Sequence, residues 1–242
     1  MADIDTTEQR ARFIVLFDID GTLITGPDKG PSAGFLSMSA ALERVTGKDD
    51  RFMSVDFAGR TDLQIARALL VASGQPDPSR NRVVDVVNSY VGFLRQNVKT
   101  APYAVLGSPR RAVARLREEG AMVALGTGNV RAGGQVKLEN AGIGDLFDMD
   151  KGGYGDDGDT RAEVLRAGVL RCSPSGSLPV IIVGDTPHDV SAAHEIGAKC
   201  VGVPYQKNDA ATLEKAGADT IVEAIDESLA SIALELLEGR AP

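Results

Sequence analysis

One stretch of the sequence decides the fold: FIVLFDIDGTLI, residues 13–24. Its first five residues, Phe13 to Phe17, are continuously apolar and rich in β-formers, which is typical of a parallel strand buried on both faces. Asp18 and Asp20 follow directly, and Gly21 permits a sharp turn after them. We therefore expect a buried strand with two carboxylates at its carboxyl end.

The chain beyond residue 105 alternates between apolar runs, which predict strands, and amphipathic patterns, which predict helices. The expected strands are 122–125, 180–183, 199–203 and 220–222, and the expected helices lie near 131–140, 190–196, 210–216 and 224–238. Such alternation indicates right-handed βαβ units. The expected fold class is α/β, with a Rossmann-like, mainly parallel sheet.

Residues 25–104 interrupt this rhythm. Helices are expected near 32–46, 62–73 and 79–99, without a convincing strand, and the turn-rich segments 27–31 and 99–109 are plausible hinges. We interpret 25–104 as an all-helical domain inserted into a discontinuous core of residues 1–24 and 105–242.

The composition narrows the class of protein. Among 242 residues, 26 Lys and Arg stand against 34 Asp and Glu, which gives a net charge of −8, and 43% are hydrophobic. The hydrophobic content excludes intrinsic disorder, and the absence of a basic run argues against a nucleic-acid partner. Two cysteines, Cys172 and Cys200, make neither a disulfide framework nor a four-ligand zinc site.

The sequence also argues against a membrane partner. No apolar run approaches the ~18–20 residues needed to cross a bilayer. The start MADIDTTEQR, residues 1–10, is acidic and polar, unlike a signal peptide. We expect a soluble, cytoplasmic protein that is a monomer or a homodimer.

Polar residues follow three of the expected strands. Because α/β sheets bind ligands beyond the carboxyl ends of their strands, Asp18, Asp20, Thr127 and Asp185 are expected to converge. Aspartate is a known covalent nucleophile toward phosphorus, and a second carboxylate two residues on could handle a proton. The DIDG stretch taken alone could equally be an ordinary acidic turn.

The second and third strand ends suit a phosphate and a cation. In LGTGN, residues 125–129, the hydroxyl of Thr127 precedes the amides of Gly128 and Asn129 at a helix start, which attracts anions, although such a stretch is also a common N-cap. In VGDTPHD, residues 183–189, Asp185 and Asp189 add two carboxylates. Oxygen ligands alone favour a hard ion such as Mg²⁺.

DIDGTL, the strand-terminal Thr127 and GDTPHD together resemble motifs one, two and four of the haloacid dehalogenase-like hydrolase superfamily. The insertion point resembles the subgroup with a helical cap after the first motif, which includes phosphoglycolate phosphatase-like enzymes. The resemblance implies a Mg²⁺-dependent phosphatase, acting on a small phosphorylated metabolite through an aspartyl-phosphate. It also implies that residues 25–104 form the cap.

The resemblance assigns a role to each matching residue. Asp18 is implied as the nucleophile and a metal ligand. Asp20 is implied to protonate the leaving oxygen, then activate water, and to give the metal its backbone carbonyl. Thr127, with the amides of Gly128 and Asn129, is implied to bind the phosphoryl group. Asp185 is implied to complete the metal site, with Asp189 holding a metal-bound water or orienting its neighbours.

One motif departs from the family pattern. The third motif is commonly a Lys in a Lys-Pro pair shortly before the fourth, and no such pair occurs here. Lys137, in the helix after GTGN, is our first candidate, because its long side chain could reach back over the strand ends. Arg161, at the start of the next helix, is the second candidate and Lys151 the third; each could instead be an ordinary exposed base.

The cap and the reaction leave alternatives open. Gly59, Arg60 and Thr61 resemble a cap loop that meets the substrate in related phosphatases, and Arg60 could pair with a second anionic group or be a surface charge. A phosphomutase, which returns the phosphoryl group to its substrate, fits the same core. A non-catalytic binding protein on this fold is the third alternative.

Overall fold

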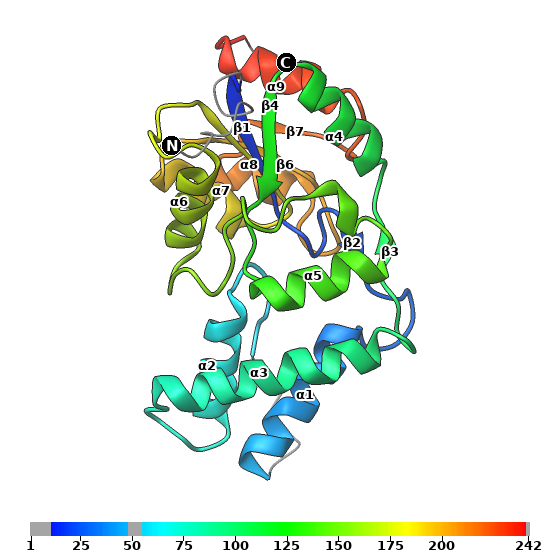
Figure 1. Cartoon of the computed structure of the whole chain (residues 1–242), viewed down its shortest axis with the longest axis vertical. Helices are drawn as coiled ribbons and strands as arrows, with labels where there is room; N and C mark the ends of the chain where they lie inside the picture. The colour runs from blue at the N-terminus through cyan, green and yellow to red at the C-terminus, as the bar shows by residue number, and fades with distance from the viewer. Residues whose placement is uncertain (1–10, 48–54, 241–242) are drawn as a thin grey trace, which may run out of the picture.

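A computed structural model of the chain describes residues 11–47 and 55–240. The polar N-terminal segment 1–10, and residues 48–54 of the inserted region, lie outside the described residues. The described part is a layered α/β core with a separate group of helices at one end (Figure 1).

The core is a five-stranded sheet in which every pairing is parallel, in the order β4-β1-β5-β6-β7. The strands are β1 Phe13–Phe17, β4 Ala121–Leu125, β5 Val180–Gly184, β6 Lys199–Gly202 and β7 Thr220–Ile221. All five residues of β1 are buried, since it has a neighbour on each edge and helices on both faces. The expected parallel α/β sheet is confirmed.

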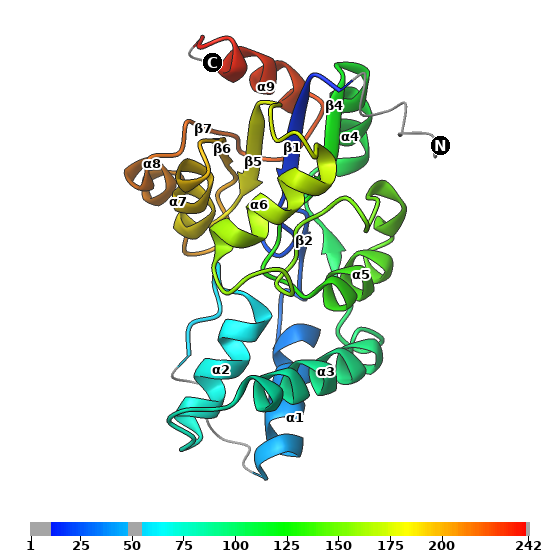
Figure 2. The ribbon, with the colours of Figure 1, turned by 60° about the vertical axis from the view of Figure 1, so that its left-hand side comes forward.

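Helices cover both faces of the sheet (Figure 2). One face packs against α6 Arg161–Cys172, α7 Pro187–Glu195 and α8 Ala210–Ala216. The other packs against α4 Pro109–Glu118 and α9 Leu229–Leu237. The helix α5 Arg131–Asn140 lies between the core and the inserted helices, in contact with α3 Arg80–Asn97 and with the short 3₁₀ helix η3 Gly144–Leu146. No helix among the described residues is long and apolar enough to cross a membrane.

The inserted region contributes α1 Ala33–Thr46, α2 Asp62–Ala72 and α3 Arg80–Asn97, which lie apart from the sheet in Figure 1. Two strands absent from our expectation, β2 Ile24–Thr25 and β3 Ala104–Val105, pair antiparallel where this region leaves and rejoins the core. A two-residue strand is too short to show any periodic pattern, which is why the sequence did not reveal it.

Strand register brings the predicted site residues together. Phe17 at the end of β1 lies level with Leu125 of β4 and Val183 of β5. The residues that follow these three positions therefore emerge at the same edge of the sheet. This edge faces the inserted helices.

The first prediction concerns the core. Ile14 of β1 is completely buried, so Ile14→Ala is expected to lower the free energy of unfolding by about 2–5 kcal/mol. Leu170→Ala, at a side chain that is 55% exposed, is the control and is expected to change it by less than about 0.5 kcal/mol. Urea unfolding measures both; equal effects would contradict the placement of β1 as a buried inner strand of the sheet.

Candidate active site

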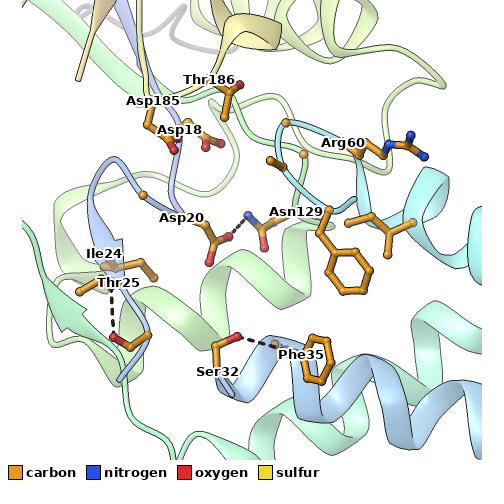
Figure 3. Close-up of a pocket in the computed structure, with 18 of the residues that line it drawn as sticks. Asp18, Asp20, Ile24, Thr25, Ser32, Phe35, Arg60, Asn129, Asp185 and Thr186 are labelled. Atoms are coloured by element: carbon orange, nitrogen blue, oxygen red, sulfur yellow. Dashed lines mark hydrogen bonds between the residues drawn. The ribbon is translucent and has the colours of Figure 1, made fainter. Parts of the chain in front are cut away.

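The turn after β1 carries two carboxylates that differ in their exposure to solvent. Asp18 is buried, whereas Asp20 is half-exposed, and both line a cavity of about 640 Å³ between the sheet edge and the inserted helices (Figure 3). Gly21 is required by the backbone here, since its φ is +80° and a Cβ would lie 2.4 Å from Oδ2 of Asp185.

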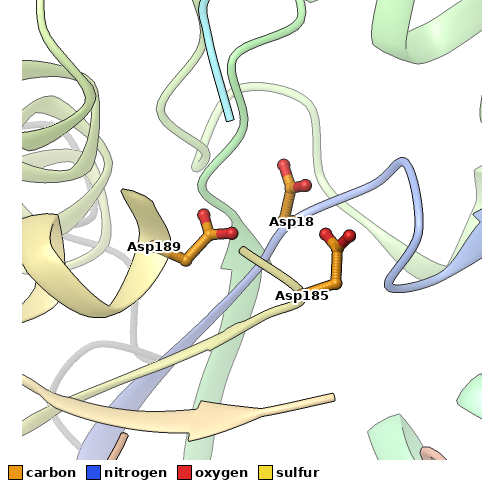
Figure 4. Close-up of side chains that lie close together, drawn as sticks. All are labelled: Asp18, Asp185 and Asp189. Carbon is orange, nitrogen blue, oxygen red and sulfur yellow. The ribbon is translucent and has the colours of Figure 1, made fainter. Parts of the chain in front are cut away.

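Three carboxylates converge at this edge: Asp18, Asp185 and Asp189 (Figure 4). Each offers an oxygen that lies within 4.8 Å of the other two. Burial, reinforced by the charges of Asp18 and Asp189, raises the pKa of Asp185 to about 9, and burial also raises the pKa of Asp18. This oxygen-only cluster has the donor chemistry and the spacing that suit Mg²⁺, which would relieve the repulsion.

Asp189 differs from the other two because both of its oxygens already have partners. Oδ1 accepts a hydrogen bond from Arg161 Nη2 at 2.6 Å. Oδ2 accepts from the backbone N–H of Thr186 at 3.1 Å and from its hydroxyl at 2.7 Å. Asp185, in contrast, accepts from the Thr22 hydroxyl at 3.3 Å, and no basic side chain of the described residues pairs with it. Asp189 therefore holds Arg161 and Thr186 in place, while the carboxylate of Asp185 is available to a cation.

Arg161 lies at the centre of the site. It is the first residue of α6, a helix whose N-terminus is fixed by a capping box between Thr160 and Glu163. Its Nη2 lies 2.7 Å from Asp18 Oδ1 as well as 2.6 Å from Asp189 Oδ1. Its buried Nε has no hydrogen-bond partner within the described structure, which leaves one donor for an anion.

Lys137 reaches the other aspartate. From α5 its Nζ lies 2.7 Å from Asp20 Oδ2 and 5.6 Å from the centre of the Tyr103 ring. Burial lowers the pKa of Lys137, but Asp20 and the neighbouring tyrosines more than offset this, so the pKa stands well above its usual range. Lys137 and Arg161, the two leading candidates for the third motif, thus both reach the site, Lys137 beside Asp20 and Arg161 beside Asp18. Lys151 does not line the cavity.

The loop 127–129 joins the two halves of the site. Asn129 Nδ2 donates to Asp20 Oδ2 at 2.8 Å and to Thr127 Oγ1 at 2.9 Å. Thr127 is completely buried, whereas Gly128 and Asn129 line the cavity. Gly128 has no room for a side chain, because a Cβ would lie 2.3 Å from the carbonyl oxygen of Arg60.

The expected cap loop lies against this loop, but its three residues differ in surroundings. Gly59 packs on the ring of His188, with a Cβ position only 2.4 Å from its Cδ2. The Thr61 hydroxyl caps α2 by accepting from the Gln64 N–H. Arg60 is exposed, and its side chain points away from Asp18 and Asp20 (Figure 3).

The cap side of the cavity is largely apolar and aromatic. Sequence reasoning did not single out these lining residues, because apolar and aromatic residues at such positions look like ordinary core residues. They include Phe35, Met38, Phe57, Ile65, Tyr90 and Tyr103.

Comparison with known proteins identifies the family. Residues 14–197 match the haloacid dehalogenase-like hydrolase family, and the chain belongs to it. The chain is 28% identical over 225 residues to "Probable phosphatase IndB" of Dickeya dadantii, covering 88% of this chain and 90% of that one. It is 25% identical over 215 residues to the phosphoglycolate phosphatase of Pectobacterium atrosepticum, covering 86% of each.

Solved structures share the fold. The structure of a predicted phosphoglycolate phosphatase from Haemophilus somnus aligns over 92% of this chain and 99% of that one. The TM-score is 0.64 at 18% identity. A β-phosphoglucomutase of Clostridium difficile aligns over 95% and 96%, with a TM-score of 0.63 at 14% identity. The structural neighbours therefore include proteins named as a phosphatase and as a phosphomutase, two of the reactions that this fold hosts.

The carboxylate cluster gives the second prediction. We expect Mg²⁺ to raise the melting temperature of the wild-type chain and to have little effect on Asp185→Asn, because that change removes the open carboxylate. Asp85→Asn, at an exposed acid in α3, is the matched control and should respond to Mg²⁺ like the wild type. An undiminished Mg²⁺ response of Asp185→Asn would place the cation elsewhere.

Proposed function

We propose that the chain is a Mg²⁺-dependent phosphatase that hydrolyses a small phosphorylated metabolite through a phosphoryl group on Asp18. The observation that supports this most strongly is the surroundings of Asp18. Its carboxylate lines the cavity, contacts the guanidinium of Arg161, and stands beside two further carboxylates of suitable spacing for a cation. Family membership and two relatives named as phosphatases point the same way.

Asp18 and Asp185, with the backbone carbonyl of Asp20, would hold the metal in this proposal. Asp189 supports it by holding Arg161 and Thr186 in place. Mg²⁺, when bound, supplies positive charge next to the phosphoryl oxygens and so lets an anionic substrate approach an acidic site.

The protein's own groups carry the proposed reaction in two steps. First, a carboxylate oxygen of Asp18 bonds to phosphorus while the bond from phosphorus to the leaving oxygen breaks, and Asp20 gives that oxygen a proton. Then Asp20 takes a proton from water, whose oxygen bonds to phosphorus and releases Asp18 and inorganic phosphate. Lys137 and Asn129 hold the Asp20 carboxylate in position for both transfers.

The phosphoryl group needs donors as well as the metal. Arg161 has a spare Nε–H, and the loop of Thr127, Gly128 and Asn129 precedes the N-terminus of α5, whose dipole favours an anion. We assign the third-motif role to Arg161, because it contacts the proposed nucleophile, and a positioning role to Lys137, which contacts the proposed acid.

The remaining space suits the alcohol part of the substrate. Phosphate oxygens would occupy the polar sheet edge, so the rest of the molecule would lie against the aromatic and aliphatic side chains of the cap. We therefore propose a phosphomonoester with substantial apolar surface, rather than one whose second anion must pair with Arg60.

The third prediction tests the reaction itself. Hydrolysis of p-nitrophenyl phosphate, measured as p-nitrophenolate release, should require Mg²⁺, stop with EDTA, and be abolished by Asp18→Asn, which removes the nucleophilic oxygen anion. Inorganic phosphate should appear in equal amount, as transfer to water demands. Activity that survives EDTA and Asp18→Asn, or no activity at all, would contradict the proposal.

The fourth prediction concerns the two basic residues. Arg161→Ala and Lys137→Ala should each lower kcat at least about tenfold, because each leaves a site aspartate without its cation. Arg161→Lys should restore little, since the lysine side chain ends one bond short of the Nη2 position from which Arg161 contacts both Asp18 and Asp189. Lys151→Ala serves as the control; turnover unchanged in both Ala variants would refute the assigned roles.

A further inference from the structure

Asp62 is a buried acid that no motif of the proposed reaction uses. It is the first residue of α2 in the inserted region, and only 6% of its surface is exposed. Burial raises its pKa to about 6, although the charge of Lys137 opposes the shift. A buried carboxylate is costly unless it has a strong partner, so its contacts need an explanation.

The hydrogen-bond partners of Asp62 are backbone groups of Gly128 and Val130, on either side of Asn129 in the core. The Asp62 carboxylate Oδ2 accepts a hydrogen bond from the backbone N–H of Val130 at 2.8 Å. The backbone N–H of Asp62 donates to the carbonyl oxygen of Gly128, also at 2.8 Å. Asp62 therefore bonds to the residues on both sides of Asn129, of which Val130 is 68 positions away along the chain.

The N-cap residue of the core helix that follows, α5, supplies no side-chain acceptor of its own. Val130 is the N-cap of α5 and makes no side-chain cap bond, in contrast to Thr61, Thr160 and Thr186 at the starts of α2, α6 and α7. The third residue of α5 is Gly133, which has no side chain to reach back to the N-cap N–H, as Glu163 does in α6. Asp62, from the inserted region, accepts from the N–H of Val130, while Asp156 Oδ2 accepts from the N–H of Arg131, the next residue, at 2.6 Å.

The helix so capped carries part of the site. Asn129 immediately precedes the N-cap of α5, and Lys137 lies within the helix; both hold Asp20 Oδ2. A shift of this helix would therefore move both partners of Asp20 together. Misplacement of catalytic groups by as little as ~1 Å can cost about 10²-fold in rate.

We propose that Asp62 is a positioning residue, which caps α5 across the boundary between cap and core and so holds Asn129 and Lys137 in register with Asp20 only while the cap loop lies against the core. The expected effect on turnover rests on the proposed phosphatase reaction, whereas the capping of α5 by Asp62 does not. Substrate contacts made by the cap would thereby be linked to the geometry of the acid–base group.

The experiment compares three variants of the full chain. Asp62→Ala removes the acceptor, and should lower kcat for p-nitrophenyl phosphate about tenfold or more with little change in KM. Asp62→Asn keeps an acceptor oxygen at the same place and should stay within about threefold of the wild type. Asp56→Ala is the matched control, because Asp56 also links cap to core, through Lys207 at 3.2 Å, but on an exposed surface.

A second readout needs no turnover. Amide hydrogen exchange at the start of α5 should be faster in Asp62→Ala than in wild type, and unchanged in Asp56→Ala. If the wild type proves inactive, the phosphatase proposal fails while this measurement still decides the capping. The inference is overturned if exchange at Val130 is unaltered, if Asp62→Asn is as impaired as Asp62→Ala, or if Asp62→Ala lowers only the melting temperature or alters only KM.

Discussion

The balance of charge in a buried space is the constraint on which the site depends. Asp18, Asp185 and Asp189 crowd together with little exposure to water, which is unfavourable for carboxylates without compensation. Arg161 compensates Asp18 and Asp189 through a single guanidinium. Asp185 accepts from the Thr22 hydroxyl but pairs with no basic side chain of the described residues, and its pKa rises to about 9. The negative charge that lacks a compensating base is therefore that of Asp185, where a cation would bind.

The fold supplies this arrangement through the register of a parallel sheet. Because β1, β4 and β5 end level with one another, residues far apart in sequence meet without any long connection between them. Gly21 and Gly128 allow the backbone to pass close to Asp185 and Arg60, where a Cβ would collide. The inserted helices then cover the edge, so that an acidic site is lined on its other side by apolar groups.

The sequence predicted the parts that depend on local patterns. The continuous apolar run of β1 and the residues after it could be read directly, and the expected helices 131–140 and 210–216 coincide with α5 and α8. What it could not decide depends on long side chains that cross between elements. Lys137 and Asp20 are 117 positions apart, and Arg161 and Asp189 are 28 apart, so reach and direction needed the structure. Asp62 drew no prediction, because it is a first-turn acid of α2, a position where acids are common for local reasons.

The central claim is that Asp18 itself carries the phosphoryl group during turnover. The most direct measurement mixes the chain with substrate and Mg²⁺, quenches the reaction in acid within the turnover time, and locates added phosphoryl mass by peptide mass spectrometry. The account predicts the added mass on the peptide that contains Asp18, absent without Mg²⁺ and in Asp18→Asn. Phosphoryl transfer to another side chain, or steady turnover in which no phosphorylated protein is trapped, would contradict it.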